Sequence, residues 1–150
     1  ARLLEAVRYV HGLGLVHTDL KPENVLLADC APLQERGGGG GKRLASLLPA
    51  SNEVTLIDFG SAAWVDGHHS ATVSTRHYRS PEVVMGLGWS LPTDIWSVGC
   101  ILVELLTGDV LFNTHHDLEH LAMMEAALGR IPEDMALRAQ GGACADCFRG

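Results

Sequence analysis

The sequence predicts a mainly α-helical domain with small β hairpins, and two kinds of pattern carry that prediction. Apolar residues recur with helical spacing in three stretches, each of which ends beside a glycine. Two short apolar runs lie on either side of a glycine-rich stretch. The chain has 150 residues, of which 47% are hydrophobic and 19% charged, which suits one globular domain.

The first helix is expected at the start of the chain. Leu3, Leu4, Val7 and Val10 follow one helical face, and Gly12 comes next as a stop signal.

Two short strands are expected on either side of an insertion. Residues 25–27 and residues 54–57 are apolar runs that suit short buried strands. Residues 28–53 contain five consecutive glycines and two prolines, a composition that resists packing and predicts an insertion loop. A phosphate-binding loop is excluded there, because with Lys42 as its lysine the first required glycine falls on Arg36.

Two further helices are expected after a long irregular stretch. One follows Pro92 and ends at Gly108, and its strongly apolar character predicts a central position. The other begins near Thr114 and Asp117, which have capping-box spacing, and ends at Gly129. The apolar positions are Ile95, Val98, Leu102, Leu105 and Leu106 in the first and Leu118, Leu121, Met124 and Leu128 in the second.

The composition argues against several function classes. Lys and Arg total 11 against 18 for Asp and Glu, a formal net charge of −7, so the chain lacks the attraction that drives direct nucleic-acid binding. The longest apolar stretch, residues 98–106, is interrupted by Glu104 and is shorter than the roughly 20 residues of a membrane span. No basic-then-apolar leader opens the chain, and no membrane partner is expected.

The four cysteines lack the dense spacing of disulfide-stapled folds, which indicates an intracellular, reducing location. Cys144 and Cys147 could join His116 and His120 as four zinc ligands. No second cysteine pair exists and two glycines precede this one, so surface thiols in an unstructured tail over residues 136–150 are the favoured interpretation.

The residues that suggest chemistry lie in two short segments. Asp19, Lys21 and Asn24 share one loop and would supply a carboxylate to orient a hydroxyl, a cation and an oxygen ligand for magnesium. Asp58 directly follows the second strand and could hold a metal, while Gly60 would give the next backbone turn its freedom. Together these groups are what phosphoryl transfer requires.

The order of four motifs along the chain resembles one known family. His-Thr-Asp-Leu-Lys-Pro-Glu-Asn at residues 17–24 precedes Asp-Phe-Gly at 58–60, Ser-Pro-Glu at 80–82 and Asp-Ile-Trp-Ser-Val-Gly at 94–99. The chain therefore resembles the C-terminal lobe of a eukaryotic protein kinase over residues 1–135. This resemblance implies a kinase-like C-terminal lobe fold without the N-terminal lobe.

Further residues resemble the LAMMER-type dual-specificity kinases of the CMGC group. The similarity lies in residues 74–82, in residues 119–125 and in Thr18, where most kinases carry arginine. Ala126 and Ser80 depart from the pattern, which has Arg and Ala at these positions. Neither departure touches the proposed chemistry.

The resemblance implies a protein kinase that uses ATP and Mg²⁺. Asp19 would be the catalytic base or hydroxyl-orienting group, and Lys21 would contact the γ-phosphate. Asn24 and Asp58 would bind magnesium, and Thr75 would brace Asp19 and Lys21. Structural support would come from His17, Gly60, Arg79, Glu82 and Asp94.

Several acidic residues gather late in the sequence and would attract basic substrates, although a merely solvated helical face explains them equally well on charge alone. The resemblance favours the first interpretation, because LAMMER-type kinases phosphorylate arginine/serine-rich splicing factors in the nucleus. It implies protein substrates and a nuclear location. The acidic residues are Asp109, Asp117, Glu119, Glu125, Glu133 and Asp134.

Thr18 cannot form the ion pair that an arginine makes with a phosphorylated activation segment. We therefore expect activity of the intact enzyme to depend little on phosphorylation of Ser70, Thr72 or Ser74. Tyr78 is interpreted as a packing residue below the substrate-binding loop rather than as a switch.

The sequence contains no glycine-rich nucleotide loop and no strand lysine of the kind that a kinase N-terminal lobe supplies. We expect the chain alone to be inactive and its residues 95–106 to expose apolar surface, with marginal solubility. The alternative function is a catalytically inactive remnant that acts only as a binding module.

Overall fold

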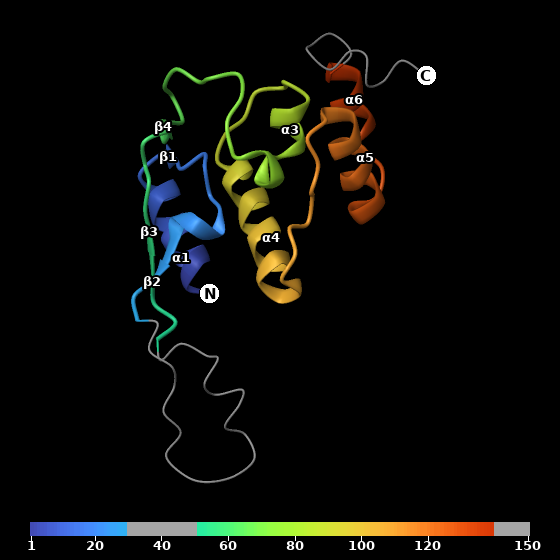
Figure 1. The fold of residues 1–150 in the computed structure, drawn as a ribbon. Coiled ribbons are helices and arrows are strands. Elements are labelled where there is room, and N and C mark those ends of the chain that lie inside the picture. The colour runs from blue at the N-terminus through green and yellow to red at the C-terminus, as the bar shows by residue number, and fades with distance from the viewer. Residues whose placement is uncertain (30–50, 140–150) are drawn as a thin grey trace, which may run out of the picture.

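The computed structural model describes residues 1–29 and 51–139. The five helices of these residues, coiled in Figure 1, are α1 (Arg2–Gly12), α3 (Pro81–Val84), α4 (Pro92–Thr107), α5 (Asp117–Leu128) and α6 (Glu133–Ala139). The strands are β1 (Leu15–Val16), β2 (Val25–Leu27), β3 (Val54–Leu56) and β4 (Ala63–Trp64), and two short 3₁₀ turns are η1 (Pro22–Asn24) and η2 (Arg76–Tyr78). Most of the predicted insertion, residues 30–50, lies outside the described part.

The strands form two small antiparallel sheets beside α1 (Figure 1). β1 pairs with β4, and β2 pairs with β3 in a register that sets Val25 opposite Leu56 and Leu27 opposite Val54. The expectation that residues 25–27 form a buried strand is wrong, since Leu26 and Leu27 of β2 are 47% and 46% exposed. Of these two strands, helix α1 packs mainly against β3, which leaves these β2 side chains exposed.

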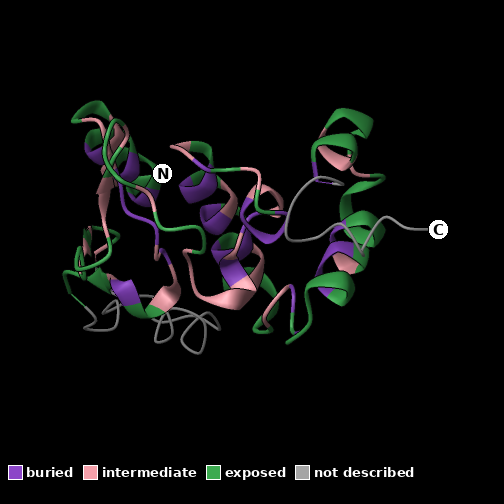
Figure 2. Ribbon diagram, turned by 90° about the horizontal axis from the view of Figure 1, so that it is seen from above, coloured by how far each residue is buried: buried purple, intermediate pink, exposed green. Residues whose placement is uncertain are grey.

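Helix α4 lies at the centre of the fold, as expected, and Figure 2 shows buried residues gathered around it. The apolar stripe of this helix is largely exposed, as expected for residues 95–106: only Val98 of the stripe is buried, while Ile95 is 49% and Leu106 87% exposed. The buried face instead carries polar side chains whose hydrogen bonds are satisfied inside the fold. Its members are Thr93, Asp94, Ser97, Val98, Cys100 and Ile101.

The main core joins α4 to residues from both ends of the described chain. Val7 of α1 and Leu20 of the following loop pack in the same cluster as Ile101, Phe112 and Met124. The loop that carries Asp19 and Leu20 is therefore anchored on a continuous core.

Helix α5 forms as predicted, but its expected capping box does not. The Thr114 hydroxyl accepts a hydrogen bond from the His116 N–H at 3.2 Å and contacts Glu119. Asp117 instead accepts a hydrogen bond from the Arg76 guanidinium at 2.7 Å. The long-range ion pair thus replaces the local cap.

The prediction of an unstructured tail from residue 136 is wrong for residues 136–139, which complete α6. Glu133 and Asp134 in the first turn and Arg138 in the last complement the helix dipole, and Ala139 is fully buried. Residues 140–150 lie outside the described part. Within the described residues, the helices are too short or too polar to cross a bilayer.

Candidate active site

A single buried carboxylate on α4 fixes the loop that follows β1. Asp94 is 1% exposed and accepts hydrogen bonds from the backbone N–H groups of His17 at 2.8 Å and Thr18 at 2.9 Å. The ring Nε2 of His11, at the end of α1, lies 2.8 Å from the same carboxylate. The first turn of α4 therefore holds both α1 and the loop in place.

The His17 ring connects this loop to the segment after β3. Its Nδ1 accepts a hydrogen bond from the Asp19 N–H at 3.3 Å, which leaves Nε2–H to donate to the Ile57 carbonyl at 3.0 Å. The ring centroid lies 4.7 Å from that of Phe59. His17 thereby sets the position of Asp58, between its two contacts.

Asp19 uses both carboxylate oxygens. Oδ1 accepts hydrogen bonds from the Thr75 N–H at 3.0 Å and the Thr75 hydroxyl at 2.7 Å, while Oδ2 accepts one from Lys21 Nζ at 2.9 Å. Burial on its own would raise the pKa of Asp19, but the hydrogen bonds from Lys21 and Thr75 together hold it below its usual value. The side chain is therefore an ionised acceptor at neutral pH.

Lys21 lies between Asp19 and the segment that carries Thr75. Its Nζ also reaches the Thr75 hydroxyl at 3.3 Å, and the hydrogen bond to Asp19, the largest cause, raises the pKa of Lys21. The charges of Glu23 and Asp58 act in the same direction. Lys21 is thus a permanent cation beside a permanent anion.

Asn24 and Asp58 come together through the β2–β3 ribbon. The Ile57 N–H donates to the Asn24 carbonyl at 3.1 Å, so Asp58 follows directly beyond the residue that faces Asn24. The Asn24 side chain donates its Nδ2–H to the Asp19 carbonyl at 2.9 Å, which leaves its amide oxygen for another partner. Among the described residues, the Asp58 carboxylate has neither a hydrogen-bond partner nor an ion-pair partner.

The expected role of Gly60 needs correction. The residue with left-handed backbone is Asp58, with φ of 62°, whereas Gly60 does not have positive φ. A Cβ on Gly60 would lie 3.3 Å from Asp58 Oδ1, a tight contact. The glycine therefore leaves room for the Asp58 carboxylate rather than freedom for a turn.

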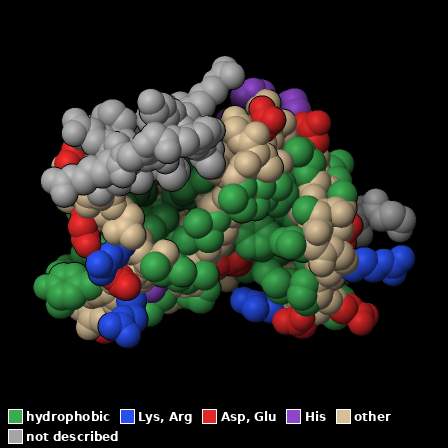
Figure 3. Space-filling model, turned by 90° about the horizontal axis from the view of Figure 1, so that it is seen from below, with side chains coloured by type: hydrophobic (Ala, Val, Ile, Leu, Met, Phe, Trp, Pro, Cys, Tyr) green, Lys and Arg blue, Asp and Glu red, His purple; other side chains and the backbone are tan. Residues whose placement is uncertain are grey.

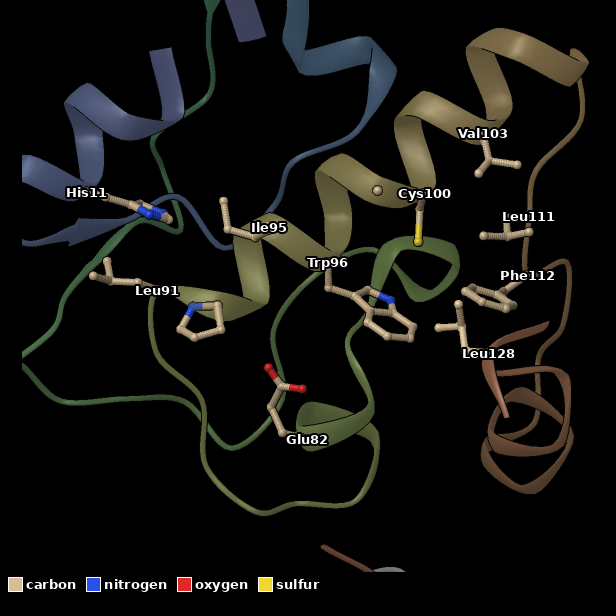
Figure 4. A pocket seen from close by; sticks show the side chains of 12 residues that line it. His11, Glu82, Leu91, Ile95, Trp96, Cys100, Val103, Leu111, Phe112 and Leu128 are labelled. Carbon is tan, nitrogen blue, oxygen red and sulfur yellow. The ribbon is translucent and has the colours of Figure 1, made fainter. Parts of the chain in front are cut away.

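Two of the predicted support residues lie outside the cluster around Asp19. Arg79 donates to the carbonyls of Val73 at 3.0 Å and Ser74 at 2.9 Å and so braces the segment before Thr75. Burial, followed by the charge of Arg76, lowers the pKa of Arg79. Glu82 instead lines an apolar groove along α4 (Figure 4), and no ion pair to it exists within the described residues.

Two depressions differ sharply in character. A polar one of about 560 Å³ lies beside Asp19 and Thr75 and is bordered by Ser61, Ser74 and Arg79. The groove of about 710 Å³ along α4 is lined mainly by apolar side chains and lies away from the Asp19 cluster. Figure 3 shows hydrophobic side chains gathered on the face seen from below.

Sequence reasoning missed three contributors to the site. They are His11 as a partner of Asp94, and Ser61 and Ser74 as partners of Thr18. His11 and Ser61 belong to no motif, and Ser74 opens the similar segment 74–82 without any sign of this bond. A histidine ending an amphipathic helix and serines in a polar loop carry no signal of partners tens of residues away.

The zinc alternative depends on Cys144 and Cys147, which lie outside the described residues. Of its two histidines, His120 is fully buried against Phe112 with a ring-centroid distance of 5.4 Å. His116 is exposed at the start of α5.

Comparison with known proteins decides the family. The family description "Protein kinase domain" matches residues 1–140. The chain belongs to the protein kinase family. Its similarity to a solved member is close: the crystal structure of the kinase domain of PF14_0431 superposes with a TM-score of 0.84 at 39% identity, covering 96% of this chain and 43% of that one. The predicted kinase-like fold is confirmed.

The resemblance of this kinase chain to LAMMER-type relatives is confirmed as well. It is 52% identical over 145 residues to serine/threonine-protein kinase AFC3 of Arabidopsis thaliana, covering 95% of this chain and 36% of the relative. It is 54% identical over 137 residues to dual specificity protein kinase lkh1 of Schizosaccharomyces pombe, covering 91% of this chain and 20% of the relative. The chain thus spans about a third or less of these relatives.

Proposed function

We propose that this chain supplies the catalytic loop and the substrate-binding segment of a protein kinase that transfers the γ-phosphoryl group of ATP to serine, threonine or tyrosine hydroxyls of proteins. The observation that carries the proposal is the arrangement of Asp19, whose carboxylate meets Lys21 on one oxygen and Thr75 on the other. A fixed carboxylate beside a fixed cation is the arrangement that phosphoryl transfer to a hydroxyl requires.

Asp19 orients the attacking hydroxyl in this proposal. Two bonds from Thr75 occupy Oδ1, whereas Oδ2 accepts only one bond, from Lys21, and retains capacity for the substrate hydroxyl. The hydroxyl oxygen bonds to the γ-phosphorus, the bond from that phosphorus to the β–γ bridging oxygen breaks, and ADP leaves with the electron pair. Because its pKa is low, Asp19 takes the hydroxyl proton only as the new O–P bond forms.

Lys21 would contact the transferring phosphoryl group. Its ammonium is held 2.9 Å from Asp19, which places positive charge beside the oxygen that orients the nucleophile. Charge fixed in advance at this point stabilises the transition state without reorganisation during the reaction.

Asn24 and Asp58 are the residues that would hold magnesium. Their fit rests on the chemistry of the donors, because the Asn24 amide oxygen and the Asp58 carboxylate are hard oxygen ligands without other partners among the described residues. Bound there, Mg²⁺ would neutralise charge on the nucleotide phosphates.

Asp19→Asn in the full-length protein tests this proposal. The amide cannot accept the proton, and we expect kcat for a serine peptide to fall at least about 100-fold while KM for ATP changes little. Asp66→Asn removes an exposed carboxylate after β4 and should retain activity. Undiminished kcat in Asp19→Asn would contradict the proposal.

The substrates we propose are basic, arginine/serine-rich proteins of the nucleus, on the strength of the LAMMER resemblance. All six acidic residues of the late cluster are exposed, which supports attraction of a basic chain. Three of them, Asp117, Glu119 and Glu125, also make hydrogen bonds within the protein. A serine peptide with its arginines replaced by glutamines should be a poor substrate, and equal turnover would contradict this specificity.

A further inference from the structure

Ser80, one of the two residues that depart from the LAMMER pattern, has a buried partner on α4. Ser80 and Thr93 are both 0% exposed, and their hydroxyl oxygens lie 2.7 Å apart in a hydrogen bond. Within the described residues, neither hydroxyl has another hydrogen-bond partner. Alanine, which the pattern has at position 80, could not form this bond.

The Ser80 hydroxyl does not serve the helix that Ser80 begins. Ser80 is the N-cap residue of α3, a position at which a serine hydroxyl usually accepts hydrogen bonds from N–H groups of its own helix. Here the side chain makes no such bond, and the Ser80 carbonyl instead accepts hydrogen bonds from the N–H groups of Val83 at 3.1 Å and Val84 at 3.0 Å. The hydroxyl is thus committed to the first turn of α4.

Helix α4 holds the backbone on both sides of Arg79. The Ser97 hydroxyl donates to the Tyr78 carbonyl at 2.8 Å, and Thr93 bonds Ser80. Positions 93 and 97 are four apart and therefore lie on one face of the helix. Arg79 lies between the two attached residues, so α4 sets the position of its backbone.

The guanidinium of Arg79 transmits this position to the main chain of residues 73–74. It donates hydrogen bonds to the carbonyl of Val73 at 3.0 Å and to that of Ser74 at 2.9 Å. These carbonyls directly precede Thr75, which contacts Asp19. A displacement of Arg79 would therefore move main chain of the proposed substrate-binding segment.

We propose that Ser80 and Thr93 are a matched pair of positioning residues, whose shared hydrogen bond sets Arg79 and thereby the affinity for the substrate peptide. The proposal rests on the proposed kinase function for its kinetic readout. The two hydroxyls bond each other and not the Asp19 cluster, so the rate of transfer from bound substrate should not depend on them.

Thr93→Val in the full-length protein is the decisive variant. Valine keeps the shape and β-branching of threonine and removes the hydroxyl. Loss of one hydrogen bond should raise KM for a serine peptide about fivefold, with kcat and KM for ATP each within about twofold of the original. A general loss of folded protein would lower kcat instead. Thr93→Ser keeps the hydroxyl and should hold KM for the peptide within about twofold of the original.

The matched control is Thr107→Val on the same helix. Thr107 is exposed, and its hydroxyl donates to the Val103 carbonyl at 3.0 Å. The same chemical change there should leave KM for the peptide unchanged.

A double-mutant cycle tests whether the two residues act through one bond. Ser80→Ala should raise KM for the peptide as Thr93→Val does, and the double variant should show about fivefold rather than the roughly 25-fold product, because the bond is lost only once. The full product would overturn the proposal, as would an unchanged KM in Thr93→Val.

Folding of the variants is itself informative. If Thr93→Val does not fold, KM in Ser80→Ala decides, and an unchanged value would overturn the proposal. Failure of both variants to fold would also overturn it, because the pair would then be needed for folding rather than for positioning.

The two proposals fail in different ways. Absence of Asp19-dependent phosphoryl transfer would contradict the kinase function. Amide hydrogen exchange needs no activity, and it should be faster in residues 73–80 of Thr93→Val than in the original protein. Equal exchange there would contradict the Ser80–Thr93 pair alone.

Discussion

Tyr78 has a packing role that its buried hydroxyl defines. The side chain is 5% exposed, and its O–H donates to Glu104 Oε2 on α4 at 2.6 Å. Burial first, and this hydrogen bond second, raise the pKa of Tyr78. A buried bond to a charged acceptor contributes about 1.5–3 kcal/mol, so Tyr78→Phe should lower the free energy of unfolding by about that amount in urea titrations. Tyr9→Phe, at an exposed tyrosine, should cost nothing measurable, and equal stability of both variants would contradict the role.

His120 makes stability depend on pH. Both ring nitrogens are buried, and within the described residues neither has a hydrogen-bond partner. Burial, with the charges of Arg76, Arg79 and His77, lowers the pKa of His120 to about 4 against the opposing charge of Asp117. The unfolded chain, with a pKa near 6.5, therefore binds a proton that the folded protein does not. Stability contributed by this residue is complete above about pH 6.5 and is lost as pH falls towards 4.

His120→Leu should remove this dependence. We expect the difference in melting temperature between pH 7 and pH 5 to shrink in the variant, as measured by thermal unfolding. His68→Leu, at an exposed histidine, should leave that difference unchanged. An identical pH profile for His120→Leu and the original protein would contradict the assignment.

The individual site residues that the sequence predicted best are those in short motifs. Asp19, Lys21 and Asn24 were predicted together and lie together, because they fall within six consecutive residues. The contact of Thr75 with Asp19 was predicted only from the family resemblance, since the two residues lie 56 positions apart in the sequence. His11 was missed, because nothing local distinguishes a histidine that bonds a carboxylate 83 residues away.

At the scale of elements, Asp94 is the most consequential single contact. It joins α4 to α1 and to the catalytic loop through three donors. Asp94→Asn retains one acceptor oxygen and turns an N–H₂ group towards the donors, which should destabilise the protein by roughly 3 kcal/mol. Urea denaturation measures this loss, with Asp66→Asn as the exposed comparison. A loss no larger than in that comparison would count against the three-way contact.

The segment between Asp58 and Glu82 should not require a phosphate. The hydrogen bond from the Ser74 hydroxyl to the Thr18 carbonyl and the two hydrogen bonds from Arg79 already fix its final part. Replacing Ser70, Thr72 and Ser74 together by alanine should lower kcat by less than about tenfold. The reason is that the hydrogen bond lost is the one from the Ser74 hydroxyl to the Thr18 carbonyl. Kinetics on the triple variant measure this, and a several-hundred-fold loss would refute it.

Helix positions were predictable from spacing, whereas the buried face of α4 was not. Periodicity assigns burial to apolar side chains, but this helix buries Thr93, Asp94 and Ser97 because each finds a specific partner. Those partners come from the catalytic loop, from η2 and from Ser80 just before α3, so the polar face is a property of the tertiary structure. The exposed Ile95 and Leu106 confirm the expectation that this helix presents apolar surface.

At the scale of the whole molecule, the sequence lacks two groups that a kinase uses to hold its nucleotide. Its only lysines are Lys21 and Lys42, and neither is the strand lysine of a kinase N-terminal lobe. None of its Gly-x-Gly pairs continues into the Gly-x-Gly-x-x-Gly pattern of a nucleotide-binding loop. We therefore expect the 150-residue chain by itself to show no magnesium-dependent ATP binding in isothermal titration calorimetry. Micromolar affinity would contradict this expectation, and marginal solubility of the isolated chain stays a prediction.

The β2–β3 ribbon has a consequence for how this protein tolerates change. Leu27 faces Val54, and the Ala28 N–H donates to the Glu53 carbonyl at 2.9 Å, so the chain leaves and re-enters the ribbon at one point. In general, each doubling of loop length costs only about 0.6 kcal/mol in closure entropy. Whatever is spliced between these paired ends, a fluorescent reporter or an affinity tag included, should leave the spacing of Asn24 and Asp58 intact.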